Sequence, residues 1–297
     1  MPKSQNKLGG FYSVLYVFST AIALAFIEDL TKAIPFTFVL WVSAVVATLI
    51  MHLVCIRRIS YIYKCLIKNK KTFLLLISSV FFIVLSSYYS SHIVGSSLYL
   101  ISYFALSGLI SLVLSKHFRL SSIPSIIAGF CYIIAIIMAF FEMLNMHQGD
   151  RAILVILIGA ISGVVYAKYI QRYASEFMLS ALESIAIRYW LVIVLIPILI
   201  PQNLVNYILT YQLMDTPIII LVAIMALILP LYFTQKALEN IHYTNALIIN
   251  ASTPIVSLII SVLFINSSIL LIKLFIPAIL VFIGTGFGAF LVLSKKT

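Results

Sequence analysis

Two charged residues, Glu183 and Arg188, lie within one long apolar stretch, residues 179–199. An ionisable group in hydrocarbon is costly, so it usually faces a cavity or a partner. We therefore predict that Arg188 contacts an anionic group of a substrate or takes part in a gate, and that Glu183 acts in gating. Snorkelling of Arg188 to the headgroups, or pairing between helices, is the alternative.

Glu28 ends an earlier apolar stretch, residues 11–31, in a chain with only eight acidic residues. A carboxylate in or beside a membrane segment can bind and release a proton or attract a cation. Glu28 is therefore the candidate for proton coupling or for an outer gate. A solvated helix end explains the same residue without any such function.

Residues 243–265 combine amides and hydroxyls with a proline. Because proline has no N–H, Pro254 leaves the carbonyl of Asn250 without its helical donor. Freed carbonyls near the middle of a membrane bind substrates or ions, or let a helix bend. We predict that Asn250 and Asn245 contact the substrate and that Pro254 acts in gating. Hydrogen bonds between helices are the competing explanation.

Several of the 17 tyrosines lie too far inside apolar stretches for an interfacial belt. Tyr99 and Tyr103 are four residues apart and share one helical face, with Ser102 beside them. Tyr166 and Tyr232 lie on other predicted helices. Together they predict an aromatic cavity that offers stacking, cation–π contacts and hydroxyl hydrogen bonds. Packing of these tyrosines between helices is an equally good explanation.

The composition indicates which elements must position these side chains. The chain has 297 residues and a net charge of +11, and it is 63% hydrophobic but only 9% charged. Soluble domains carry about 25% charged residues, so a soluble enzyme, a disordered chain and a secreted disulfide scaffold are excluded. Long unbroken apolar runs disfavour a transmembrane β-barrel, whose strands alternate. The prediction is an all-α polytopic membrane protein.

Ten apolar segments are each long enough to cross a bilayer. If the N-terminus is cytoplasmic, fifteen Lys and Arg residues fall in inner segments and three in outer ones. This bias predicts a multi-pass protein of the cell (inner) membrane with both termini in the cytoplasm. Tyr88 and Tyr89, near an outer end, are assigned to an interfacial belt. The predicted spans are 11–31, 35–54, 72–91, 95–115, 122–142, 152–172, 179–199, 217–236, 243–265 and 269–293.

The chain divides into two halves of five predicted spans, residues 1–148 and 149–297. Shifting the first half by 148 residues places the polar Ser102 on Asn250. An odd number of spans in each half forces the halves into opposite orientations. Such inverted repeats are typical of secondary transporters, which alternate access around a site near the membrane midplane.

Local patterns in the second half carry a family resemblance. A Lys-Ala-Leu turn (residues 236–238) precedes the ninth span, Pro254 lies within that span, and residues 284–288 are glycine-rich. An acidic residue followed by an arginine, Glu183 and Arg188, comes before them. In these features the chain resembles the EamA-like family of the drug/metabolite transporter superfamily. The resemblance implies a central cavity lined by spans 1, 3, 4, 6, 8 and 9.

We therefore expect a secondary transporter that moves a small polar or amphipathic metabolite, amino-acid-like and cationic or zwitterionic, by alternating access. Its expected partners are that small molecule, the lipid bilayer and a coupling ion, either a proton or sodium. A homodimer is left open, and no nucleic acid, cofactor or metal is expected. An integral-membrane enzyme acting on a lipid or a peptide, and a membrane scaffold without transport, are the alternatives.

Overall fold

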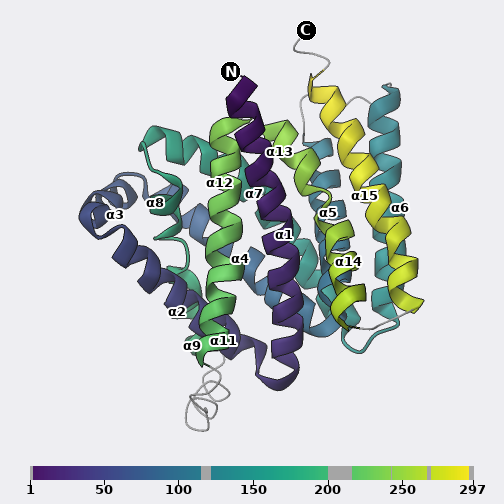
Figure 1. The fold of residues 1–297 in the computed structure, drawn as a ribbon, viewed down its shortest axis with the longest axis horizontal. Helices are drawn as coiled ribbons and strands as arrows, with labels where there is room; N and C mark the ends of the chain where they lie inside the picture. The colour runs from purple at the N-terminus through teal and green to yellow at the C-terminus, as the bar shows by residue number, and fades with distance from the viewer. Residues whose placement is uncertain (1–2, 115–121, 200–215, 242, 266–268, 294–297) are drawn as a thin grey trace.

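The computed structural model describes residues 3–114, 122–199, 216–241, 243–265 and 269–293 (Figure 1). Within these residues, ten helices are long and apolar enough to cross a membrane. Their ends differ from the predicted spans by no more than four residues. The prediction of an all-α polytopic membrane protein is therefore confirmed. Residues 200–215, between the seventh and eighth predicted spans, lie outside the described residues.

The first half of the chain supplies spans 1 to 5, which are helices α1, α2, α4, α5 and α6. Two short helices, η1 and α3, connect spans 2 and 3 and do not cross the membrane. The bounds are α1 Lys3–Ala33, α2 Phe36–Val54, η1 Ile56–Arg58, α3 Ile59–Lys68, α4 Lys70–Val94, α5 Ser96–Val113 and α6 Ile123–Leu144.

The second half supplies spans 6 to 10, and three of these spans are irregular. Span 7 consists of α8 and α9, span 8 runs through α11, the π-helical η3 and α12, and span 9 consists of α13 and α14. The bounds are α7 Gly149–Glu176, α8 Ala181–Ile185, α9 Trp190–Leu199, α11 Thr216–Val222, η3 Ala223–Ile228, α12 Leu229–Asn240, α13 Tyr243–Asn250, α14 Thr253–Ile265 and α15 Ile269–Leu293.

The break in span 9 follows from its proline. Pro254 cannot donate to the carbonyl of Asn250, and the hydroxyl of Thr253 donates to that carbonyl instead. The expected break is therefore present, but a side chain of the same span already uses the freed carbonyl. The prediction of a turn at residues 236–238 is wrong, because these residues continue α12 as far as Asn240.

The irregularities of spans 7 and 8 are joined to each other. Pro230 lies just after the π-helical turns of η3. The carbonyl of Leu227 in η3 accepts a 2.6 Å hydrogen bond from the phenol of Tyr189. Tyr189 lies in the break between α8 and α9, where the sequence carries neither proline nor glycine. Beside it, the side chain of Arg188 donates to the carbonyl of Ser184, and the N–H of Arg188 bonds the carbonyl of Ile185 instead.

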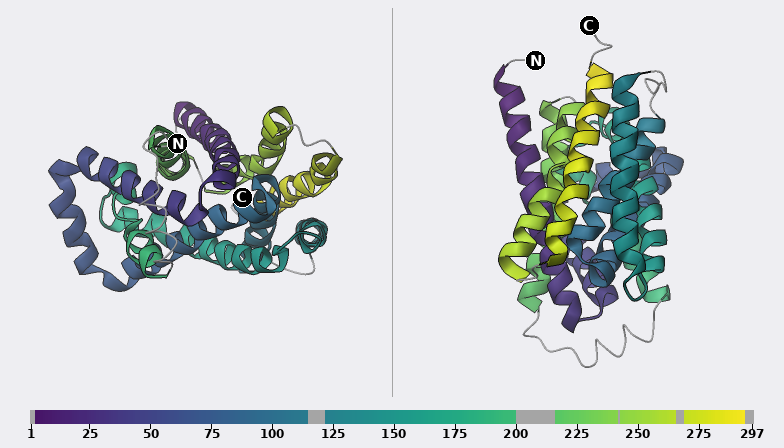
Figure 2. Two further views of the ribbon diagram at one scale, coloured as in Figure 1. Left: turned by 90° about the horizontal axis from the view of Figure 1, so that it is seen from below. Right: turned by 90° about the vertical axis from the view of Figure 1, so that its right-hand side faces the viewer.

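The helices of the two halves interleave (Figure 2). Helix α1 packs against α12, α7 against α4, and α6 against α15. Span 1 therefore packs on span 8, span 6 on span 3, and span 5 on span 10. The first two pairs are equivalent when each span is replaced by its counterpart in the other half, and the third pair is its own equivalent. The start of α1 and the end of α15 lie at the same end of the bundle, as an even number of crossings requires (Figures 1 and 2). The division at residue 148 stays a prediction.

Candidate functional site

A cavity of about 520 Å³ lies inside the bundle, with walls from both halves. Sites for small molecules usually measure about 300 to 1,000 Å³. The walls come from α1, α4, α5 and α7, and from the segment that runs through η3, α12 and α13. These are the spans 1, 3, 4, 6, 8 and 9 that the resemblance implies. Spans 5, 7 and 10 contribute further residues.

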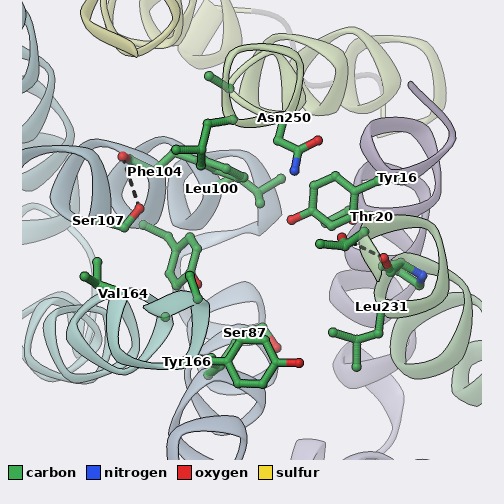
Figure 3. Close-up of a pocket in the computed structure, with 18 of the residues that line it drawn as sticks. Tyr16, Thr20, Ser87, Leu100, Phe104, Ser107, Val164, Tyr166, Leu231 and Asn250 are labelled. Carbon is green, nitrogen blue, oxygen red and sulfur yellow. Dashed lines mark hydrogen bonds between the residues drawn. The ribbon is translucent and has the colours of Figure 1, made fainter. Parts of the chain in front are cut away.

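Tyrosines dominate the chemistry of the cavity wall. The rings of Tyr99 and Tyr103, one turn apart on α5, have centroids 5.6 Å apart. Figure 3 shows Tyr16 of α1, Tyr166 of α7 and Asn250 of α13 around one common space. Such a wall offers aromatic faces for stacking and phenol groups for hydrogen bonds. The tyrosines in the wall are Tyr16, Tyr88, Tyr99, Tyr103, Tyr132, Tyr166 and Tyr189.

Polar groups interrupt the apolar wall at a few points. Asn250 is 9% exposed, and its Oδ1 has no hydrogen-bond partner among the described residues. No charged side chain belongs to the wall in the part of the chain that the structure describes. Because an unpaired charge is costly in such surroundings, the cavity suits a ligand without a large net charge. The other hydroxyl and amide side chains of the wall are Thr20, Ser87, Ser107, Ser111, Thr234, Gln235 and Thr285.

Each irregular span of the second half contributes to this wall. Tyr189 comes from the break in span 7, Leu227 from η3 in span 8, and Asn250 from the end of α13, just before the break in span 9. Discontinuous helices in transporters bring polar backbone groups to the substrate site. Here the carbonyls of Leu227 and Asn250 already accept side-chain hydroxyls. The Asn250 atom without a partner among the described residues is the side-chain Oδ1, which is open to a ligand.

Arg188 lies directly behind the wall. Its guanidinium carbon is 5.0 Å from the ring centroid of Tyr166, and its side chain is 3% exposed. Nε and Nη2 donate to the carbonyl and hydroxyl of Ser184, at 2.7 and 3.0 Å. Nη1 has no hydrogen-bond partner, and no carboxylate forms an ion pair with Arg188 among the described residues. This buried positive charge is therefore compensated only in part.

Glu183 pairs with the other half of the protein and not with Arg188. Its Oε1 lies 3.0 Å from Nη1 of Arg58, in η1. Its Oε2 accepts a 2.9 Å hydrogen bond from the backbone N–H of Ser180 and so caps α8. Close by, the hydroxyl of Tyr61 donates to the carbonyl of Phe177 at 2.9 Å. Glu183 thus joins the segment after span 2 to the beginning of span 7.

Glu28 acts as a cap within the first half. Its Oε2 accepts hydrogen bonds from the N–H and the hydroxyl of Ser96, both at 2.7 Å. Ser96 begins α5, where the unpaired N–H groups of the helix favour an anion. The preceding Gly95 has a φ of +86°, which allows the sharp turn from α4. Glu28 does not belong to the cavity wall, and its role in coupling stays a prediction.

Three of the remaining predicted site residues do not belong to the cavity wall. Ser102 is fully buried and does not belong to the wall. Tyr232 does not belong to it either, and its ring centroid lies 6.4 Å from that of Tyr12. Pro254 is the second residue of α14 and does not belong to the wall. The side chain of Asn245 lies outside what the structure describes. The predicted residues that the structure brings together in the wall are Tyr99, Tyr103, Tyr166 and Asn250.

The sequence reading missed other wall residues. Tyr88 was assigned to an interfacial belt, but it is 1% exposed and faces the cavity. The assignment to a belt is wrong for Tyr88 because α4 continues six residues further, to Val94. Tyr132 of α6 shares a 2.9 Å hydrogen bond with Thr285 of α15, and both belong to the wall. Their position depends on the packing of spans 5 and 10, which local sequence does not show.

Comparison with known proteins identifies the class. Residues 150–289 match the EamA-like transporter family, part of the drug/metabolite transporter superfamily. The second half of the chain is therefore similar to EamA-like transporters, and the predicted resemblance is confirmed for these residues. The crystal structure of a protein with 13% sequence identity has a related fold, with a TM-score of 0.60 over 100% of both chains. A search of curated proteins finds no match.

Proposed function

We propose that the protein moves a small amphipathic metabolite across the membrane by alternating access. The observation that carries this proposal is the central cavity, whose wall combines α1, α4 and α5 of one half with α7, α12 and α13 of the other. Rocking of one half against the other would expose such a cavity to each side in turn. The interrupted spans around it provide places where the second half can bend.

The ligand that fits this wall best is zwitterionic and amino-acid-like. The tyrosine rings suit an apolar or aromatic body, and the amide of Asn250 suits a polar head. Arg188 lies one side chain behind Tyr166 and adds positive potential on that side. A carboxylate is favoured there over a second cation, because opposite charges attract strongly at low dielectric. A zwitterion therefore matches the wall better than a ligand with a net positive charge.

The orientation and the energy source belong to the same proposal. The excess of Lys and Arg in alternate connections supports an inner-membrane protein with both termini in the cytoplasm. A proton gradient, a sodium gradient or exchange of two solutes would each drive transport. Reactivity of single cysteines near the two ends toward an impermeant reagent tests the orientation. Uptake with each gradient imposed separately identifies the driving force.

Transport in proteoliposomes tests the proposed function. A thermal-shift screen of the purified protein against amino acids and related metabolites first finds a ligand, since a bound ligand raises apparent stability. We expect saturable, protein-dependent uptake of that ligand, and a loss of about tenfold or more in Asn250→Ala, a fall of about 1.4 kcal/mol or more in binding. Asn145→Ala is the matched control, because Asn145 is exposed and its side-chain amide donates to the carbonyl of Phe141, one helical turn earlier.

The same preparation separates the two rival functions. A membrane enzyme acting on a lipid or a peptide would convert the ligand to a product in detergent, where no transport occurs. A scaffold would neither transport nor convert any ligand, and Asn250→Ala would have no effect. Ligand binding with chemical conversion but without vesicle uptake contradicts the proposal.

A further inference from the structure

Helix α3 differs from the other helices of the first half in its direction. Seen along the bundle in Figure 2, the segment containing α3 extends sideways at the edge of the molecule. It is too short to cross a membrane, and it connects spans 2 and 3. Ile62, Cys65 and Leu66 form its buried face, at helical spacing. A short helix with one apolar face that lies across the bundle has the geometry of an interfacial helix.

Contacts with the second half hold α3 in place. The phenol of Tyr63 accepts a 2.9 Å hydrogen bond from the indole of Trp190 and is 2.8 Å from Nε2 of His52. Burial raises the pKa of this phenol, although the hydrogen bond from Trp190 lowers it. At the beginning of α3, Arg58 pairs with Glu183 at 3.0 Å. The inner face of α3 is therefore occupied, and its orientation is fixed.

The outer face of α3 and its flanks is strongly basic. No acidic residue occurs between residues 55 and 71. Among the described residues, none of the five basic side chains other than Arg58 forms an ion pair. Two apolar side chains beside them, Ile56 and Ile67, are 63% and 67% exposed. The five exposed residues that form this basic face are Arg57, Lys64, Lys68, Lys70 and Lys71.

We propose that this basic face binds the headgroups of anionic phospholipids, with Ile56 and Ile67 entering the acyl region beneath them. A basic surface next to a membrane attracts anionic lipid, by about 1 kcal/mol for each Lys or Arg, which is about fivefold in affinity. Exposed isoleucines beside lysines match the boundary between acyl chains and headgroups, because water on one side and lipid on the other satisfy both. This site is separate from the transport cavity, and it does not depend on the transported ligand.

Lipid binding to the full-length protein in detergent tests this proposal. Native mass spectrometry compares phosphatidylglycerol with phosphatidylcholine of the same acyl chains. We expect preferential retention of phosphatidylglycerol, and a loss of about 25-fold in its affinity in the Lys64→Gln/Lys68→Gln variant. The matched control is Arg151→Gln/Lys273→Gln, which removes two exposed charges far from α3 in the sequence and should leave retention unchanged.

Two further measurements distinguish lipid binding from misfolding of the variant and from a site that binds a phosphate group alone. Lys64→Arg/Lys68→Arg keeps the charge and should keep the preference for phosphatidylglycerol. Glycerol phosphate, which has the headgroup charge without acyl chains, should not compete at the same concentration. Equal retention of the two lipids, an equal loss in the Arg151/Lys273 control, or full competition by glycerol phosphate would overturn the proposal.

Discussion

Nη1 of Arg58 lies 3.0 Å from Oε1 of Glu183, and this ion pair joins the two halves of the chain. The two partners differ in exposure: 51% of the Arg58 side chain is exposed, but only 8% of the Glu183 side chain. Removing the arginine therefore leaves a nearly buried carboxylate without its cation. Removing the carboxylate leaves an arginine that water can solvate. The two single changes should have unequal consequences.

Arg58→Gln should lower the thermal unfolding midpoint in detergent more than Glu183→Gln does. The double variant should be no less stable than Arg58→Gln, with a coupling of about 1 kcal/mol between the two sites. Lys32→Gln is the control, because its pair with Asp29 is exposed on both sides, at 58% and 77%, and should contribute nothing measurable. Equal losses in both single variants, adding fully in the double variant, would show that the ion pair is not coupled.

Replacing Arg188 should separate transport from stability. A buried cation without a carboxylate partner is costly to the free protein, so Arg188→Gln should leave the unfolding midpoint unchanged or raise it. If the charge attracts the carboxylate of the ligand, uptake should nevertheless fall by about tenfold or more. Arg188→Lys should retain part of the activity, since it keeps the charge but loses the fork geometry of the guanidinium.

Lys168 provides the comparison for Arg188. It also lies over a tyrosine, at 5.9 Å from the ring centroid of Tyr169, but it is exposed. Lys168→Gln should change neither uptake nor stability. Uptake and the unfolding midpoint are measured on the same preparation of each variant. A parallel fall of both in Arg188→Gln would assign Arg188 to packing alone.

Hydropathy and charge predicted the ten spans and the even number of crossings, because a lipid environment limits a chain to helices of about 20 apolar residues. The proline rule also located the break after Asn250. The break between Ile185 and Trp190 had no such signal. Its two side-chain contacts, from Arg188 to the carbonyl of Ser184 and from Tyr189 to the carbonyl of Leu227, are visible only in the structure.

The candidate site was predictable only where it depends on local spacing. Tyr99 and Tyr103 are one helical turn apart and share one face of α5. A prediction that this face lines the cavity therefore places both residues in the wall. Arg58, the ion-pair partner of Glu183, is 125 positions earlier in the chain and lies in the first half, so no local pattern could indicate this pair. Local spacing also could not place Arg188 behind Tyr166, because their proximity depends on how spans 6 and 7 pack.

A glycine beside the cavity provides a steric test. A Cβ on Gly163 of α7 would overlap the hydroxyl of Tyr103 and lie 3.1 Å from its Cζ. Gly163→Ala should therefore push the ring of Tyr103 toward the cavity, raise the KM for uptake severalfold and cost about 1–3 kcal/mol of stability. Gly286→Ala is the control, because nothing lies within 4 Å of its added Cβ. An unchanged KM in Gly163→Ala would show that Tyr103 does not shape the ligand site.

The hydroxyls of Ser97 in α5 and Ser261 in α14 are 3.0 Å apart and connect the two halves. In a Ser97→Cys/Ser261→Cys variant without the three native cysteines, an oxidant should form a disulfide. Rocking of the halves would then be blocked, so uptake should stop on oxidation and return with a reductant. Ser122→Cys/Ser125→Cys is the matched control, since these hydroxyls are bonded to each other within the first half. Full uptake by completely cross-linked Ser97→Cys/Ser261→Cys protein would contradict alternating access by relative motion of the halves at this contact.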